Sequence, residues 1–112
     1  MDAVFICTPT FIHLPLVKEV AAHGIDVFVE KPFTESYYKS FRLLDIVNSA
    51  GIRCAVGYVY SYHPTFRKQI ELVKNGAIGR VTEINGTAFH SEVFSPKKGW
   101  LFDSSLSGGG AV

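Results

Sequence analysis

The sequence has almost no excess of charge of either sign. Its 11 Lys and Arg residues nearly balance its 10 Asp and Glu residues, for a formal net charge of +1 over 112 residues. A neutral chain gives no electrostatic basis for binding nucleic acid or an anionic membrane. It also lacks the apolar run of roughly 20 residues that a membrane-spanning helix needs, and Asp2 stands where a secretory signal is basic. We therefore expect a globular cytoplasmic protein with neither nucleic acid nor membrane as a partner.

Cysteine is scarce as well. Cys7 and Cys54 are the only two, and each lies in a strand-like apolar run. This pattern is typical of buried thiols in a reducing compartment and does not favour a disulfide. No grouping of His, Cys and carboxylate residues has the spacing of a zinc site, so we predict no metal.

What the sequence does contain is an alternation of apolar runs with segments of helical periodicity. The expected strands are residues 3–7, 26–29 and 52–59. The expected helices are residues 14–23, a second segment that carries Tyr37 to Val47 and stops at Gly51, and residues 64–75. Strands alternating with helices predict an α/β fold with a parallel sheet and right-handed crossovers. In the second helix we expect Ser36 or Thr34 as the cap, Gly51 as the stop, and one apolar face formed by Tyr37, Phe41, Leu44 and Val47.

The pattern changes after Gly79. Residues 81–89 alternate between polar and apolar side chains, which predicts an antiparallel strand with one side facing solvent or a ligand. Residues 91–107 are polar and contain Pro96 and Gly99, which predicts a long loop. The first expected strand starts at residue 3, and three parallel strands cannot cover their own edges. We interpret the chain as an internal piece of a larger protein.

Polar residues follow each expected strand, and the carboxyl ends of parallel strands open onto one edge of the sheet, where ligands bind. The residues expected to converge there are Thr8, Thr10, His13, Glu30, Lys31, Tyr58, Tyr60 and Tyr62. The sequence Glu30-Lys31-Pro32 adds a sharp turn, because the residue before proline avoids helical geometry and the bond to proline can be cis. The turn would aim Lys31 over the sheet edge; the alternative is that Glu30 and Lys31 form a solvated strand end.

Six stretches in this order resemble one known family. They are A-V-F-I-C-T-P-T-F-I-H, V-F-V-E-K-P-F-T, G-Y, H-P-T-F, N-G-A-I-G-R-V, and a Trp followed by S-G-G-G-A-V. Together they resemble the glucose–fructose oxidoreductase/inositol dehydrogenase (Gfo/Idh/MocA) family. The resemblance implies that residues 1–63 form the C-terminal part of a Rossmann-type parallel sheet. It implies that residues 64–112 begin an α/β domain with an open, mostly antiparallel sheet.

The resemblance also implies an NAD(P)-dependent oxidoreductase that acts on a sugar, polyol or related hydroxyl or carbonyl compound, with homo-oligomers in the full-length protein. The cofactor, NAD or NADP, would contact Thr8, Pro9, His13, Glu30, Lys31 and Pro32. Lys31 would be catalytic, because a cation beside a developing alkoxide lowers the barrier to hydride transfer. The implied substrate contacts are Tyr60, Tyr62, His63 and Trp100; a structural role is an open alternative for His63, as it is for His90.

The chain departs from the family pattern in three ways. It contains no G-x-G-x-x-G turn for the cofactor phosphates, and the family's acid/base histidine would follow residue 112. We therefore expect the fragment alone to bind cofactor weakly and to be inactive. Tyr60 and Ser61 stand where many members carry arginines.

Two other readings remain open. One is a response-regulator receiver domain, in which Thr8 and Lys31 would sense a phosphoryl group. Against it, only Asp2 precedes Thr8 as an acidic residue, whereas a receiver needs several. The other is a non-catalytic relative of the oxidoreductases.

Overall fold

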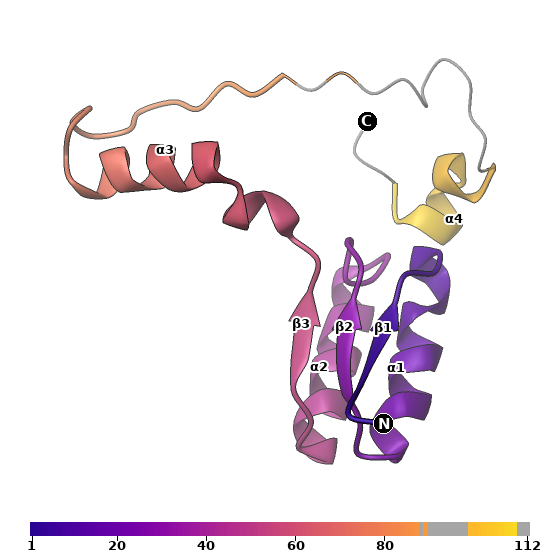
Figure 1. The fold of residues 1–112 in the computed structure, drawn as a ribbon. Helices are drawn as coiled ribbons and strands as arrows, with labels where there is room; N and C mark the ends of the chain where they lie inside the picture. The colour runs from indigo at the N-terminus through magenta and orange to yellow at the C-terminus, as the bar shows by residue number, and fades with distance from the viewer. Residues whose placement is uncertain (88, 90–98, 110–112) are drawn as a thin grey trace. The chain divides into compact units, whose positions relative to one another are not determined.

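Three parallel strands form the centre of the fold. The computed structural model describes residues 1–87, 89 and 99–109 (Figure 1). The strands are β1 (Ala3–Ile6), β2 (Asp26–Val29) and β3 (Cys54–Val56), in the order β1-β2-β3. In the register of the sheet, Ala3 is opposite Asp26, and Val27 is opposite Cys54. The predicted α/β fold with adjacent parallel strands is confirmed, although the first and third strands are shorter than expected.

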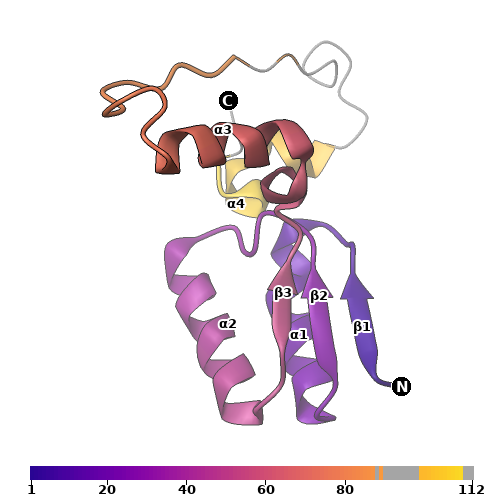
Figure 2. The ribbon, with the colours of Figure 1, turned by 60° about the vertical axis from the view of Figure 1, so that its left-hand side comes forward.

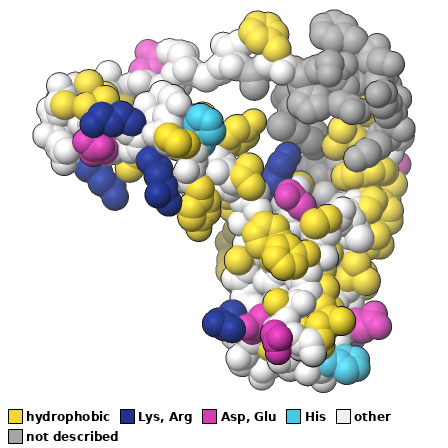
Figure 3. Space-filling model, viewed as in Figure 1, with side chains coloured by type: hydrophobic (Ala, Val, Ile, Leu, Met, Phe, Trp, Pro, Cys, Tyr) yellow, Lys and Arg dark blue, Asp and Glu magenta, His cyan; other side chains and the backbone are white. Residues whose placement is uncertain are grey.

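Two helices cover the same face of this sheet (Figures 1 and 2). They are α1 (His13–Ala22) and α2 (Tyr37–Ala50). Between helices and sheet lies the core, made of Ile6, Val17, Val27, Val29, Leu43 and Val47. On the opposite face the rings of Phe5 and Phe28 lie 5.2 Å apart, and Phe5 is 72% exposed. Hydrophobic side chains gather over the strands on that open face (Figure 3).

Helix α2 begins and ends where the sequence predicts. The Ser36 hydroxyl accepts a hydrogen bond from the Lys39 backbone N–H at 3.3 Å, and Gly51 ends the helix with a left-handed φ of 65°. The predicted apolar face is right only at Val47. The buried residues are Leu43 and Val47, one turn apart, whereas Tyr37, Phe41 and Leu44 are exposed. The face that packs on α1 and the sheet is set by aliphatic side chains that fit between them, and the larger aromatic rings contact one another outside.

The chain divides into two compact units, one of residues 1–57 with the described residues 99–109, and one of residues 58–97. The second unit contains the 3₁₀ turn η2 (Val59–Tyr62) and helix α3 (Pro64–Lys74), with Pro64 in the first turn and no buried residue. The predicted strand over residues 81–89 is wrong for the residues described, 81–87 and 89, which have no strand assignment. A strand needs a hydrogen-bonding neighbour, and no described segment pairs with this one.

The last described segment belongs to the first unit. It forms the 3₁₀ turn η4 (Gly99–Phe102) and the short helix α4 (Ser104–Ser107), with Asp103 as its cap. The prediction of a loop is therefore wrong over residues 99–107, while residues 91–98 lie outside the described part, as does His90. The predicted domain boundary near residue 64 stays a prediction. The contacts instead return residues 99–109 to the sheet-containing unit.

The prediction of buried thiols is wrong for Cys7 and holds only in part for Cys54. Both thiols are free, but Cys7 follows the end of β1 and is exposed, whereas Cys54 is half-buried in β3. Burial raises the pKa of the Cys54 thiol. Among the described residues, no cluster of His, Cys and acidic side chains could hold a metal ion. No helix in the described ranges has the length and apolar character to cross a membrane.

Shortening Leu43 should test the core. Its side chain is completely buried, so Leu43→Ala should leave a cavity and destabilise the fold by about 2–5 kcal/mol. The matched control is Leu44→Ala on the same helix, where the side chain is 44% exposed and the expected loss is below about 1 kcal/mol. Urea unfolding followed by circular dichroism measures both. Equal losses in the two variants would contradict the described packing of α2.

A second prediction concerns the amino end of the sheet. The Asp26 carboxylate accepts hydrogen bonds from the Arg53 backbone N–H at 2.8 Å and from its guanidinium at 2.7 Å. These hydrogen bonds lower the pKa of Asp26 below its usual 3.8. The unfolded chain is then protonated first as the pH falls, so the stabilisation is present above about pH 4 and is lost below it.

Asp26→Asn should therefore lower the urea midpoint at neutral pH, and the difference from wild type should shrink as the pH falls below 3.8. The control is Asp45→Asn, which removes an exposed charge of the same sign from α2. A difference between Asp26→Asn and wild type that stays constant with pH would show that the ion pair does not stabilise the fold.

Candidate functional site

The candidate site lies where the three strands end. Two backbone hydrogen bonds extend the pairing of the sheet there: Glu30 N–H donates to the Ile6 carbonyl, and Gly57 N–H donates to the Val29 carbonyl, each at 2.9 Å. The peptide unit that joins Val29 to Glu30, the first residue beyond the central strand, is thus held on both sides. The chains leaving β1 and β2 carry Thr8, Thr10 and the Glu30-Lys31-Pro32 turn at the same edge, as predicted for this unit.

The Glu30 carboxylate is fixed by its neighbours. Its Oε2 atom accepts a hydrogen bond from the Lys31 backbone N–H at 2.9 Å. A Cβ placed on Gly57 would lie 3.1 Å from Glu30 Oε1 and 3.2 Å from the Phe28 ring. Gly57 therefore leaves the space that the carboxylate occupies. Sequence reasoning named the Gly57-Tyr58 pair as part of a motif and missed this role; a glycine at a strand end is the signal that a neighbour approaches closely.

Lys31 presents an unpaired charge. Its side chain is exposed, and its ammonium makes no hydrogen bond or ion pair with any described residue. The Lys31–Pro32 peptide bond is cis, one of the two conformational features anticipated for this turn. Because it has no partner among the described residues, the Lys31 ammonium is free to meet a ligand at the carboxyl edge of the sheet.

His13 connects the two loops of this edge. The ring is fully buried at the start of α1. Its Nε2 atom lies 3.0 Å from the Thr8 carbonyl oxygen, and its Nδ1 atom lies 3.2 Å from the carbonyl oxygens of both Pro32 and Phe33. The structure thus brings His13 together with Thr8 and the turn after β2. Backbone carbonyl oxygens face both ring nitrogens, and each nitrogen that carries a proton donates to them.

Two threonines and a proline form the turn after β1. Pro9 precedes the 3₁₀ turn η1 (Thr10–Ile12), and Thr10 is 2% exposed. The hydroxyl oxygen of Thr8 is buried and has no hydrogen-bond partner among the described residues. A buried hydroxyl without a partner is uncommon and often marks a place where a ligand or an ion binds.

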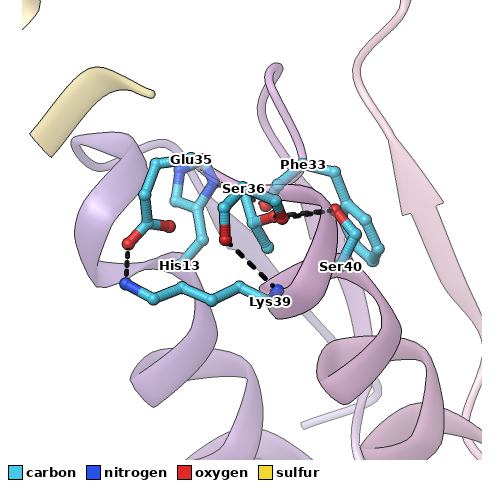
Figure 4. Close-up of polar contacts among 7 residues, drawn as sticks. His13, Phe33, Glu35, Ser36, Lys39 and Ser40 are labelled. Atoms are coloured by element: carbon cyan, nitrogen blue, oxygen red, sulfur yellow. Dashed lines mark hydrogen bonds and ion pairs between the residues drawn. The ribbon is translucent and has the colours of Figure 1, made fainter. Parts of the chain in front are cut away.

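Glu35, whose side chain is buried, is a residue that sequence reasoning did not select. Figure 4 shows the start of α2, where Glu35 forms an ion pair with Lys39. The two residues are four apart in the sequence, and this i, i+4 spacing predicts such a pair. Thr34 donates a hydrogen bond to the Ser36 carbonyl at 2.7 Å. Gly108 packs on the Glu35 backbone, and a Cβ there would lie 2.8 Å from the Glu35 carbonyl carbon. The segment after α4 thus approaches the loop that follows Pro32.

The predicted substrate contacts are divided between the units. Trp100 lies in the first unit, with its ring 6.2 Å from that of Phe11 in the turn after β1. Tyr60, Tyr62 and His63 lie in the second unit. There the Phe66 ring lies 5.5 Å from Tyr60 and 6.1 Å from His63, while the Arg67 guanidinium sits 5.3 Å from the centre of the Tyr62 ring. Their role as substrate contacts stays a prediction.

The chain is similar in sequence to known oxidoreductases. A family model described as "Oxidoreductase family, NAD-binding Rossmann fold" matches residues 1–58. The scyllo-inositol 2-dehydrogenase (NAD(+)) of Bacillus subtilis is 34% identical over 80 residues, 71% of this chain and 23% of the relative. The D-xylose 1-dehydrogenase [NADP(+)] of Haloarcula marismortui is 28% identical over 113 residues, 99% of this chain and 31% of the relative.

A solved structure extends the likeness to the whole chain. The aldose-aldose oxidoreductase from Caulobacter crescentus superposes with a TM-score of 0.80 at 26% identity, covering 99% of this chain and 32% of that one. The chain thus spans about a third or less of the length of these proteins. The match to a Rossmann family also overturns the receiver-domain alternative.

The close approach of Gly57 to Glu30 can be tested directly. Gly57→Ala should push the carboxylate away and weaken its hydrogen bond from the Lys31 backbone N–H, because the new methyl group would lie 3.1 Å from Glu30 Oε1. The Lys31 amide resonance in a ¹H–¹⁵N spectrum should then shift upfield. In the control variant, Gly86→Ala, the added methyl group meets nothing within 4 Å. An unmoved Lys31 resonance in Gly57→Ala would refute the described contact.

Proposed function

Because the chain belongs to the Gfo/Idh/MocA oxidoreductase family, whose NAD-binding Rossmann fold its residues 1–58 match, we propose that it is part of an NAD(P)-dependent oxidoreductase. The observation that carries the proposal is the Glu30-Lys31-Pro32 turn, which follows the central strand with a fixed carboxylate and a free ammonium. The alternative that the two residues are a solvated strand end does not account for the fixed position of Glu30.

The residues present fit one end of a dinucleotide. Thr8 offers a buried hydroxyl without a partner, and the Glu30 carboxylate has Oε1 available for a ribose hydroxyl. Pro9 and Pro32 supply apolar surface in the two turns beside them, and Lys31 adds a positive charge. The chain contains no glycine-rich phosphate turn, so these residues would hold the nicotinamide end. The cofactor supplies the hydride chemistry when bound.

Lys31 would act on the substrate oxygen. As hydride leaves a carbon, a proton leaves the attached hydroxyl, and negative charge develops on that oxygen. An ammonium beside it stabilises this charge and orients the hydroxyl in the ground state. Such a group needs a position fixed by the backbone and no competing partner, and Lys31 has both in the described part of the chain.

The substrate would be a sugar, a polyol or a related compound, since the two curated relatives above are named as dehydrogenases of an inositol and of xylose. Trp100, Tyr60, Tyr62 and His63 would then contact it, because aromatic faces and ring nitrogens suit the apolar faces and hydroxyl groups of a carbohydrate. We also propose a cytoplasmic homo-oligomer as the full-length form. No observation favours a non-catalytic relative, and the following experiment distinguishes it.

Removing the lysine should affect turnover more than binding. In the intact protein, Lys31→Ala should lower kcat and kcat/KM by about a hundredfold or more, because the interaction is made mainly in the transition state. Glu30→Ala should instead raise the dissociation constant of the cofactor. Assays would pair NAD⁺ or NADP⁺ with myo-inositol, scyllo-inositol and D-xylose, and calorimetry would measure cofactor binding.

Lys18→Ala is the matched control, since it removes an exposed lysine from α1 at a distance in sequence from the turn. It should behave as wild type. Turnover close to wild type in Lys31→Ala would show that the lysine is only a solvated strand end. Cofactor binding without turnover in the unmodified protein, with every substrate, would favour the non-catalytic relative.

A further inference from the structure

We propose that His13 is a positioning residue that sets the place of Lys31 by joining the turn after β1 to the turn after β2. The inference rests on the proposed function, because it assigns His13 a part in the same reaction. It concerns a residue that would not touch substrate and acts through the backbone of Pro32 and Phe33.

The first argument is where the ring lies. His13 is fully buried, although histidine is usually only partly buried in proteins. A buried imidazole must satisfy its ring nitrogens within the protein, because an unmet polar group costs roughly 1–3 kcal/mol. Among the described residues, its partners are three backbone carbonyl oxygens, at 3.0–3.2 Å, and a carbonyl accepts a hydrogen bond only from a ring nitrogen that carries a proton. The burial is thus tied to these contacts.

The second argument is which carbonyls these are. The Thr8 carbonyl belongs to the turn after β1, and the Pro32 and Phe33 carbonyls belong to the turn that follows Lys31. These residues are far apart in sequence, and neither turn has regular secondary structure at the atoms concerned. The ring is therefore a cross-link between two irregular segments, at the one place where Lys31 must be held.

The third argument is that His13 has no ring nitrogen available to a ligand. Both ring nitrogens face backbone oxygens, so neither is free to hydrogen-bond a cofactor or a substrate. Thr8 and Lys31, by contrast, each have an unpartnered polar group in the described structure. The geometry therefore separates a supporting residue, His13, from the residues it supports.

The consequence for catalysis follows from the short path between them. Pro32 directly follows Lys31, so a shift of the Pro32 carbonyl moves the lysine backbone. A misplacement of about 1 Å in a reacting group can cost on the order of a hundredfold in rate. Loss of the cross-link should therefore lower kcat more than it weakens cofactor binding, because Glu30, which would hold the ribose, is fixed by the sheet and by the Lys31 backbone N–H.

Three substitutions of His13 separate its contact with Thr8 from its contacts with Pro32 and Phe33. His13→Ala removes all of them. His13→Asn keeps an amide near the Nδ1 position, toward Pro32 and Phe33, and His13→Gln keeps one near Nε2, toward Thr8. The control is His23→Ala at the other end of α1, where the ring is exposed and contacts only the Glu19 carbonyl, at 2.9 Å.

The experiment uses the intact protein, the cofactor and substrate pairs named above, and a temperature at which circular dichroism shows each variant folded. We expect His13→Ala to lower kcat about a hundredfold with a change in cofactor KM below about threefold. His13→Asn and His13→Gln should fall between His13→Ala and wild type, and His23→Ala should match wild type. A normal kcat in folded His13→Ala, or a raised cofactor KM with kcat unchanged, would overturn the proposal.

Hydrogen exchange of the His13 ring tests the bridge without an activity assay, for the case in which a variant fails to fold or no substrate is turned over. In ¹H–¹⁵N spectra of the unmodified protein, a ring N–H of His13 should exchange slowly with water, and that of His23 should exchange fast. Fast exchange at His13 would overturn the bridge. Absence of cofactor binding and turnover in the unmodified protein, together with slow exchange at His13, would instead refute the proposed function and leave the bridge standing.

Discussion

The site depends on the two backbone hydrogen bonds that continue the sheet beyond its strands. Glu30 donates to Ile6, and Gly57 donates to Val29, so the peptide unit between Val29 and Glu30 is held by both neighbouring chains. Parallel pairing places all three strand ends at one edge, and these bonds fix how far each chain runs before it diverges. The side chains of Glu30 and Lys31 therefore start from a rigid backbone position, which a catalytic or binding group requires.

The sequence predicted this frame because its signals are local. Continuous apolar runs identify the strands, although one face of the sheet is exposed in the described structure, and a helix between two such runs makes them parallel. Ser36 and Gly51 mark the ends of α2 by their own hydrogen bonding and left-handed conformation. The position of Lys31 beyond β2 follows from the same reasoning, since it needs only the end of one strand.

What the sequence could not predict depends on contacts between distant residues. The choice of Leu43 over Leu44 as a buried residue is set by the fit against α1 and the sheet, and the two positions have the same chemistry. The polar and apolar alternation of residues 81–89 satisfies the pattern of a strand, yet a strand forms only beside a partner. The close approaches of Gly57 to Glu30 and of Gly108 to the Glu35 backbone depend on neighbours from other segments.

What distinguishes the lysine of the turn is the carboxylate beside it. Lys39, Arg53 and Lys68 form ion pairs with carboxylates, while Lys31, like Lys18 and Arg42, forms none with a described residue. Glu30 stands directly before Lys31, but its carboxylate accepts from the lysine's backbone N–H and not from its ammonium.

That choice has a consequence for reactivity. A carboxylate bound to the ammonium would neutralise the charge that a developing alkoxide needs, whereas one bound to the backbone instead fixes the turn. In water the free ammonium interacts weakly with other charges, and its interaction grows several-fold once a ligand excludes solvent and lowers the local dielectric constant. The hydrogen bond from Lys31 to Glu30 thus fixes the turn while leaving the ammonium unpaired until a substrate oxygen arrives.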